Sequence, residues 1–173
     1  MRLEKQITNN KFLNIKEVKD TSLKCNGYQF AERLGIDSIA FICYDREKES
    51  FLLNNEVTPP IGKFLIRAFG GSLDNPEMSK KEIVQREVEE EVGYTVKEDD
   101  IKFLGECFVS TQMNQYCYLY IVFIDQNKYH ERKPENEMEA LSHPVWKTFD
   151  EIMDGDDWKS ITILQKSIHK KVI

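Results

Sequence analysis

The sequence lacks an apolar run long enough to cross a bilayer. Its longest run, from Leu119 to Ile124, falls far short of the roughly 20 residues that a membrane-spanning helix needs, and it is expected to form a buried strand. The opening segment MRLEKQITNN contains no apolar stretch typical of a secretory signal. We therefore expect a cytoplasmic protein with no membrane partner.

Cysteine and histidine are scarce, and their spacing is not typical of a metal site or a catalytic site. The four cysteines form no C-x-x-C pair and have no histidine at metal-ligand spacing, which argues against zinc binding and redox catalysis. We expect reduced thiols in the core. The three histidines lie among polar or basic neighbours, so none is a strong catalytic candidate.

A surplus of positive charge is also absent. The 24 basic and 30 acidic residues give a formal net charge of −6, which argues against a nucleic-acid backbone as the main partner. Apolar and aromatic residues make up 40% of the 173, enough for one compact core without disulfide or metal staples.

The chain divides into two parts, and neither contains an internal repeat. Residues 1–36 are mixed and polar, which predicts an N-terminal arm of short strands. Within residues 37–173, the segment 116–124 is apolar on both faces and is expected at the centre of a sheet. Further strands are expected over 38–44, 50–54, 63–69, 101–109 and 144–149, a surface loop over 130–143, a short helix or turn over 149–156 and a terminal helix over 158–171. This order predicts an α/β (α+β) sandwich.

One helix carries the most informative pattern. Ser79 and Glu82 have the spacing of a capping box, and Gly93 is placed as a C-terminal cap, so a helix is predicted between them. One apolar stripe would hold it against the sheet, formed by Val84, Val88 and Val92. At about 100° per residue, the carboxylates that share the neighbouring face are Glu87, Glu90 and Glu91.

This acidic face has two explanations. Like charges three or four residues apart repel by roughly a few tenths of a kcal/mol per pair, which solvation alone can offset. Alternatively, the face binds Mg²⁺ or Mn²⁺, which prefer hard oxygen ligands. Glycines just before the helix favour the second explanation, because they let the backbone approach a ligand closely. Arg86 can pair with Glu77 or another carboxylate and hold the preceding loop.

These residues resemble the Nudix box, G-x5-E-x7-R-E-U-x-E-E-x-G-U, in which U is a bulky apolar residue. The matching positions, with one extra residue before the arginine, are Gly71, Glu77, Arg86, Glu87, Val88, Glu90, Glu91, Gly93 and Tyr94. Since the capping box places the helix start at Ser79, we expect the extra residue in the loop at Met78. The acidic face then stays intact, and the pairing of Glu77 with Arg86 becomes longer or indirect.

The resemblance implies a fold and a chemistry. Nudix hydrolases are α/β/α sandwiches around a mixed sheet, and they use Mg²⁺ or Mn²⁺ to hydrolyse a nucleoside diphosphate linked to another moiety. It implies a Nudix hydrolase domain over residues 37–173. The implied roles are metal binding by Glu87, Glu90, Glu91 and the carbonyl of Gly70, a catalytic role for Arg86, and structural roles for Glu77 and Gly93.

Further segments are similar to the branch of the family that acts on ADP-ribose and nucleotide sugars. They are GYTV at the end of the box, the E-N-E loop after the late strand, and the terminal DWKSITILQ. In that branch a late-loop glutamate often serves as the base, which implies Glu135 first and Glu137 second; a merely solvated acidic loop is an equal alternative. The arm would correspond to a segment that forms a homodimer.

Two departures from the branch lie near the substrate. Arg67 stands where members often carry glutamate, and Thr111 or a neighbour where they carry proline. Arg67 and Gly71 are therefore candidates for substrate binding. We expect a hydrolase for ADP-ribose or a nucleotide sugar; the alternatives are a Nudix enzyme for a dinucleoside polyphosphate or nucleoside triphosphate, and a nucleotide-binding regulator without turnover.

Overall fold

The computed structural model describes residues 1–33 and 37–173, which form a ten-stranded mixed sheet with helices on both faces of its larger part. The boundary expected between residues 36 and 37 adjoins residues 34–36, which lie outside the described residues. The division into two domains therefore stays a prediction. Among the described residues, no helix combines the length and apolar character needed to span a membrane.

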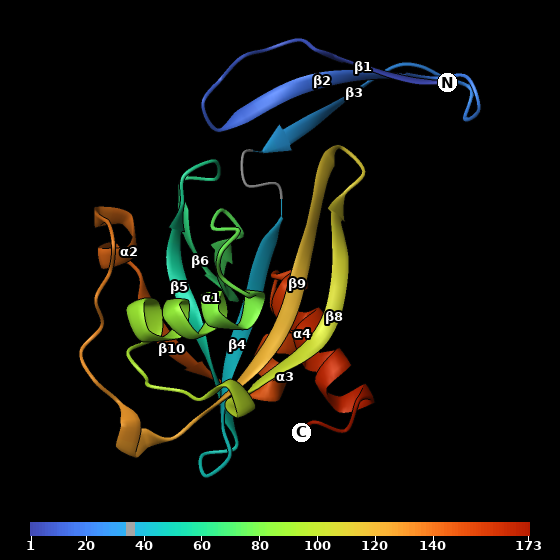
Figure 1. The fold of residues 1–173 in the computed structure, drawn as a ribbon. Coiled ribbons are helices and arrows are strands. Elements are labelled where there is room, and N and C mark those ends of the chain that lie inside the picture. Colours follow the sequence, from blue (N-terminus) through green and yellow to red (C-terminus); the bar gives the residue numbers. More distant parts are fainter. Residues whose placement is uncertain (34–36) are drawn as a thin grey trace.

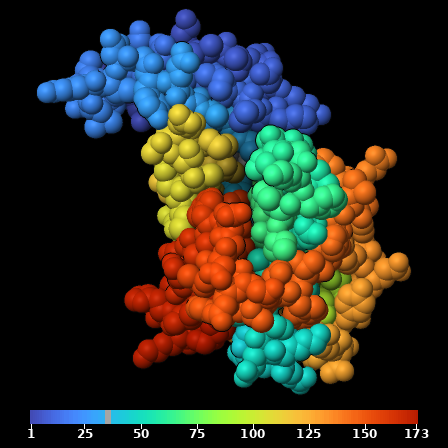
Figure 2. Space-filling view, turned by 180° about the vertical axis from the view of Figure 1, so that it is seen from behind, coloured from blue at the N-terminus to red at the C-terminus, as the bar shows by residue number. Residues whose placement is uncertain are grey.

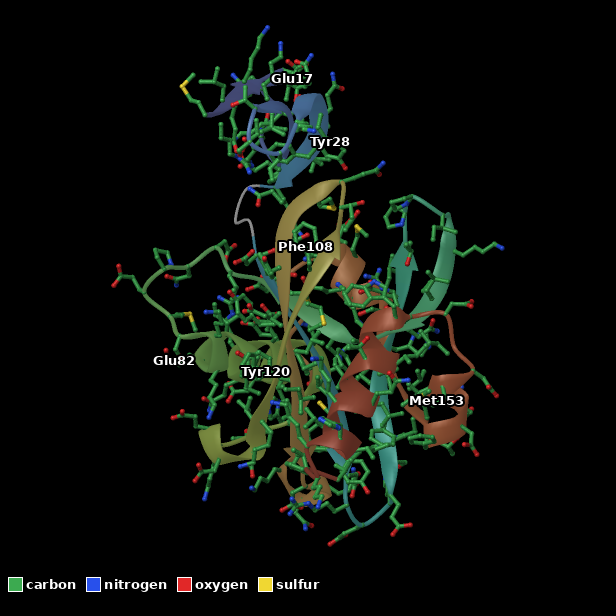
Figure 3. All side chains as sticks on the ribbon, turned by 90° about the vertical axis from the view of Figure 1, so that its right-hand side faces the viewer. Glu17, Tyr28, Glu82, Phe108, Tyr120 and Met153 are labelled. Carbon is green, nitrogen blue, oxygen red and sulfur yellow. The ribbon has the colours of Figure 1, made fainter. Side chains whose placement is uncertain are left out.

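The N-terminal arm is a three-stranded antiparallel sheet at one end of the molecule (Figure 1). Its strands are β1 (Arg2–Gln6), β2 (Leu13–Asp20) and β3 (Cys25–Arg33), which confirms the predicted short strands. β3 joins the body through one parallel pair, Ala31 with Met113. Tyr28 and Phe108, labelled in Figure 3, line a cavity of about 220 Å³ where arm and body meet.

Two parallel strands, β4 (Ser38–Asp45) and β9 (Met113–Ile124), form the centre of the body. This confirms the central position predicted for 116–124. The other strands pair antiparallel around them: β5 (Ser50–Thr58) and β7 (Phe69–Ser72) with β4, β8 (Ile101–Ser110) with β9, and β6 (Lys63–Arg67) and β10 (His143–Lys147) with β5.

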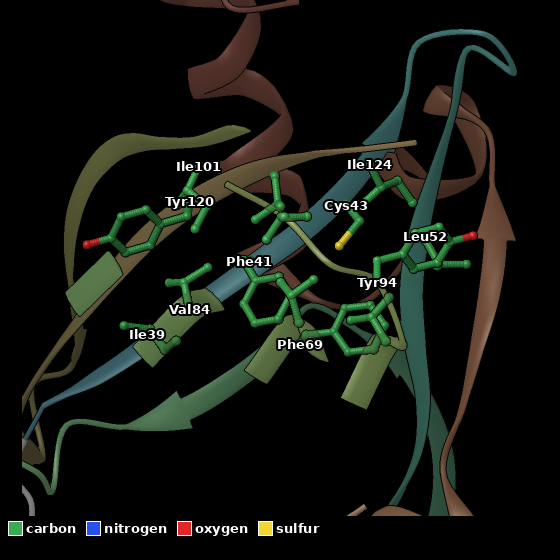
Figure 4. Close-up of a cluster of buried hydrophobic side chains, with 14 of the residues drawn as sticks. Ile39, Phe41, Cys43, Leu52, Phe69, Val84, Tyr94, Ile101, Tyr120 and Ile124 are labelled. Atoms are coloured by element: carbon green, nitrogen blue, oxygen red, sulfur yellow. The ribbon is translucent and has the colours of Figure 1, made fainter. Parts of the chain in front are cut away.

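Side chains alternate along β4 and build a core on each face of the sheet. Its odd-numbered apolar residues lie in the core under α1 (Lys80–Glu87), and its even-numbered ones lie in the core under α4 (Trp158–His169). Figure 4 shows the first core, where the rings of Phe41 and Phe69 stack with centres 5.4 Å apart. Figure 2 shows α4 on the rear face. The predicted α/β/α sandwich around a mixed sheet is confirmed.

Two segments differ from expectation. The strand predicted over 63–69 is divided, because the chain changes its pairing partner from β5 to β4 at Ala68. The surface loop predicted over 130–143 contains a short helix, α2 (Glu137–Leu141). The remaining helical segments are η1 (Val88–Val92), η2 (Glu98–Asp100), η3 (Gln126–Lys128) and α3 (Phe149–Met153).

Candidate active site

The acidic helix begins where its sequence predicts. Ser79 Oγ accepts from the amide of Glu82 at 3.2 Å, and the carboxylate of Glu82 accepts from the amide of Ser79 at 2.7 Å, a complete capping box. The predicted apolar stripe is buried against the sheet, with Val84, Val88 and Val92 each at most 1% exposed. The helix is thereby fixed in rotation, and its carboxylates lie at the edge of the core.

The last turn of this helix is a π-turn, η1. The amides of Gly93 and Tyr94 both donate to the carbonyl of Val88, at 2.9 and 3.4 Å, and Gly93 ends the turn with φ of 80°. A π-turn contains more residues than an α-turn, so an ideal α-helical wheel misplaces Glu90 and Glu91 relative to Glu87. Such turns are frequent at functional sites.

Glu87 lies between Arg86 and the backbone of β7. Arg86 Nη2 donates to Glu87 Oε1 at 2.9 Å, and Arg86 Nε lies 3.7 Å from Glu90 Oε2. A Cβ atom on Gly71 would lie 2.5 Å from Glu87 Oε1, so only glycine leaves room for this carboxylate. Burial raises the pKa of Glu87 above its usual range, although Arg86 opposes this effect.

The pairing of Arg86 with Glu77 is not found among the described residues. Arg86 instead pairs with the other carboxylates, and its Nη1 lies 4.0 Å from Met78 Sδ. The reason is the extra residue, which lies in the loop before Ser79 as predicted and brings Met78, rather than the exposed Glu77, against the arginine.

Glu91 is the most buried carboxylate of the site, at 8% exposure. Its Oε2 and that of Glu90 are buried without a hydrogen-bond partner. Burial raises the pKa of Glu91 to about 9, and the nearby charges of Glu87, Glu139 and Glu56 add to the effect. Burial and the charge of Glu135 also raise the pKa of Glu90. When its carboxylates are ionised, the site therefore carries more negative than positive charge.

The end of the helix holds the late loop in place. The backbone amide of His130 donates to the carbonyl of Gly93 at 2.7 Å, and the backbone amide of Lys133 donates to the carbonyl of Glu90 at 3.1 Å. A Cβ atom on Gly93 would lie 2.5 Å from the carbonyl oxygen of His130. The loop then brings Glu135 close enough for its charge to raise the pKa of both Glu87 and Glu90. Gly93 thus lies at the contact between the end of the acidic helix and the loop that carries Glu135.

A glutamate that the sequence reasoning did not single out also faces the site. Glu139 on α2 lines a cavity of about 260 Å³ together with Glu56 and Glu91. Its Oε2 accepts from the amide of Glu135 at 2.7 Å. Glu137 is exposed at the start of α2. The available signal was the N-x-x-E spacing at Asn136, whose side chain caps α2 and orients Glu139.

The remaining candidates lie on neighbouring strands. Arg67 Nη1 pairs with Glu56 Oε1 at 2.7 Å, so Arg67 reaches the acidic cavity through Glu56. Gly70 lies on β7 beside Gly71, and a Cβ atom there would lie 2.8 Å from the carbonyl oxygen of Ile39. β7 therefore passes between the central strand and the acidic helix.

The residues present fit a divalent cation by their chemistry. Within residues 1–33 and 37–173, no three Asp, Glu, His or Cys side chains are already gathered in a metal-holding arrangement. Two buried carboxylate oxygens, Oε2 of Glu90 and Oε2 of Glu91, accept no hydrogen bond, although Arg86 Nε lies 3.7 Å from the first, and the surrounding carboxylates repel one another. Hard oxygen donors in excess of positive charge are what Mg²⁺ and Mn²⁺ prefer.

The sandwich fold and the glycine-flanked acidic helix together define a hydrolase of Nudix type. The model of the NUDIX domain matches residues 36–166. The chain therefore belongs to the NUDIX family, whose hydrolases generally use divalent cations, and it is a pyrophosphohydrolase.

Comparison with solved structures supports the fold. The crystal structure of an ADP compounds hydrolase superposes with a TM-score of 0.72 at 13% sequence identity, covering 97% of this chain and 91% of that chain. At this identity the likeness concerns the fold alone. A search of curated proteins gave no significant match.

Proposed function

We propose that the protein hydrolyses a nucleoside diphosphate linked to another moiety, with Mg²⁺ or Mn²⁺ as cofactor. ADP-ribose or a nucleotide sugar is the proposed substrate, and the products are a nucleoside monophosphate and a sugar phosphate. The observation that carries this proposal is the excess of carboxylates at the end of the acidic helix, where Arg86 pairs with Glu87 and Glu90 while Glu91 Oε2 is buried without a hydrogen-bond partner.

Carboxylates alone would repel a pyrophosphate, so the site needs cations to bind this substrate. Divalent cations supply neutralisation of the pyrophosphate oxygens and acidification of water. In this proposal Glu87, Glu90 and Glu91 hold the cations, with the carbonyl of Gly70 as a further ligand. Arg86 orients Glu87 and Glu90 through its ion pairs.

Glu135 is the proposed general base. It is exposed to incoming water, and its charge is felt by Arg86, Glu87 and Glu90. In that position its carboxylate would accept a proton from the attacking water. Glu137 is the second choice. Gly71 is proposed to contribute to substrate binding by leaving room for the carboxylate of Glu87, and Arg67 is proposed to contact the moiety beyond the phosphates.

The choice of ADP-ribose as first substrate has separate support. The solved structure with the similar fold is named for ADP compounds. A cytoplasmic location and a homodimer formed through the arm belong to the same proposal.

The test is a panel of ADP-ribose, NADH, GDP-mannose, a dinucleoside polyphosphate and ATP, each incubated with Mg²⁺ and analysed by product chromatography. A chelator control should abolish turnover. Glu90→Gln and Glu91→Gln should abolish it too, whereas Glu89→Gln, in the same turn of the helix, should retain it. Turnover of only the polyphosphates would favour the second candidate substrate class. Tight nucleotide binding without any hydrolysis would favour a regulator.

A further inference from the structure

The amide of Ala68 lies between two strand ladders. β6 ends at Arg67, which pairs with Asn54 of β5, and β7 begins at Phe69, which pairs with Phe41 of β4. The Ala68 amide instead donates to Asp157 Oδ2 at 2.9 Å, across 89 positions of sequence. A side chain from the C-terminal part of the chain therefore holds the point at which β6 becomes β7.

Asp157 is itself firmly held. It is the N-cap of α4, and the same oxygen accepts from the amide of Ser160 at 3.0 Å and from its hydroxyl at 2.6 Å. Ser160 is buried. Later in α4, Ile163 and Leu164 are fully buried in the core between this helix and the sheet. The oxygen that binds Ala68 is therefore part of a rigid helix end.

The course of β7 determines what lies beneath the acidic helix. Three residues after Ala68, the backbone of Gly71 lies against the carboxylate of Glu87, where a Cβ atom would lie 2.5 Å from Oε1. Phe69 lies between Ala68 and Gly71 in the sequence, and its ring stacks on Phe41 in the core under α1. A shift of the bend at Ala68 would move the backbone against which Glu87 rests.

We propose that Asp157 is a positioning residue for the acidic site. By holding the Ala68 amide from the rear of the sheet, it fixes β7 against the carboxylate of Glu87 at the front. It acts through the backbone and touches neither substrate nor cation. The inference rests on the proposed function in one respect, the binding of a divalent cation by Glu87.

Two substitutions separate this role from helix capping. Asp157→Ser retains a capping oxygen for the amide of Ser160, but its side chain is too short to reach Ala68 as well. Asp157→Asn retains an oxygen for both. Asp157 and Arg67 line an adjoining cavity of about 350 Å³, and shortening residue 157 to serine extends this cavity toward the freed amide, so water can replace the lost acceptor and the serine variant is expected to fold.

Thr148→Ala is the matched control for stability. Thr148 is the exposed N-cap of α3, in a complete capping box, and its loss should destabilise the protein to a similar degree without altering β7. The full-length variants are titrated with Mn²⁺ alone, and hydrogen exchange is measured for the amides of residues 68–72 in the presence of chelator.

Asp157→Ser should weaken Mn²⁺ binding by about three- to tenfold, less than the loss typical of direct outer-shell partners, and should speed exchange in residues 68–72. Asp157→Asn and Thr148→Ala should keep nearly the wild-type Mn²⁺ affinity and the wild-type exchange rates in residues 68–72. An equal loss of Mn²⁺ affinity in Thr148→Ala would overturn the proposal, as would wild-type exchange in Asp157→Ser. If the wild type binds no Mn²⁺ while exchange still responds to Asp157→Ser, the proposed function fails and the positioning of β7 stands.

Discussion

Gly71 and Glu87 are in such close contact that no other residue type fits at position 71 without moving the carboxylate. A Cβ atom there would lie 2.5 Å from Oε1 and 2.8 Å from Cδ of Glu87. The atoms that it would meet belong to the flexible end of a side chain rather than to backbone. The contact therefore constrains the geometry of the site more than the stability of the fold.

Gly71→Ala should separate function from stability. The backbone of Gly71 has no positive φ, so alanine is tolerated, and the free energy of unfolding should fall by no more than about 1 kcal/mol. Because Glu87 must rotate away, turnover should fall by about 10- to 100-fold and Mn²⁺ affinity should fall with it. Calorimetry, steady-state kinetics and Mn²⁺ titration measure the three quantities.

Gly70→Ala is the contrasting variant. Its Cβ atom would meet the carbonyl oxygen of Ile39 at 2.8 Å, an atom of the central strand that cannot move easily. In this variant the free energy of unfolding should fall more than the Mn²⁺ affinity of the folded protein. Wild-type Mn²⁺ affinity in folded Gly71→Ala would show that Glu87 is not a ligand.

The acidic helix was predictable because its signals are local. The capping residues, the valine stripe and the glycine at its end all lie within one segment, and each predicts the structure found there. The π-turn was not predictable from an ideal α-helical wheel. It arises because two successive amides, of Gly93 and Tyr94, both bond to the carbonyl of Val88.

Long-range contacts explain most of what sequence reasoning misses. Where the strand 63–69 is divided, the amide of Ala68 donates to Asp157, which no local pattern connects with Ala68. The helix α2 has only five residues, none of them buried, so it is too short to show a helical periodicity; its capping residue Asn136 marks its start instead. The N-x-x-E spacing at Asn136 is the one local signal that separates Glu139, which faces the site, from the exposed Glu137.

Gly93→Ala should destabilise the protein by two separate effects. The residue has φ of 80°, and a Cβ atom would lie 2.5 Å from the carbonyl oxygen of His130. Strain at a positive φ costs about 1 kcal/mol, and the collision with backbone adds to it, so a loss of at least about 2 kcal/mol is expected. Urea unfolding measures this loss.

Gly62→Ala isolates the first effect. Gly62 has φ of 69°, and a Cβ atom there would have no other atom within 4 Å, so alanine meets only the backbone strain. The difference between the two variants is the contribution of close packing between the helix end and the late loop. Equal losses would show that the loop does not depend on this contact.

The stability of the metal-free protein should fall as pH rises. Glu91 has a pKa of about 9 in the folded protein, against the usual value of 4.5, so the folded state retains a proton that the unfolded state releases. The stabilising effect is fully present below about 4.5 and is lost as pH rises toward 9. The slope approaches about 1.4 kcal/mol per pH unit, measured by urea unfolding in chelator.

Glu91→Gln should remove most of this slope and should make the metal-free protein more stable than the wild type at about pH 8. Glu89→Gln, in the same π-turn, should keep the slope. Mg²⁺ should stabilise the wild type more strongly at high pH, because it binds the ionised carboxylates. A slope that persists in Glu91→Gln would assign the titration to another group.

Glu135 and Glu137 can be separated by the same change at each position. Glu135→Gln removes the proposed base and should lower kcat by about 10²- to 10⁴-fold, with Mn²⁺ affinity little changed. Glu137→Gln should keep nearly the wild-type rate, since Glu137 is exposed at the start of α2, whereas the charge of Glu135 acts on Glu87 and Glu90 and raises the pKa of both. If Glu135→Gln retains the wild-type rate while Glu139→Gln loses it, Glu139 is the base, and its bond to the amide of Glu135 holds the loop in place for that role.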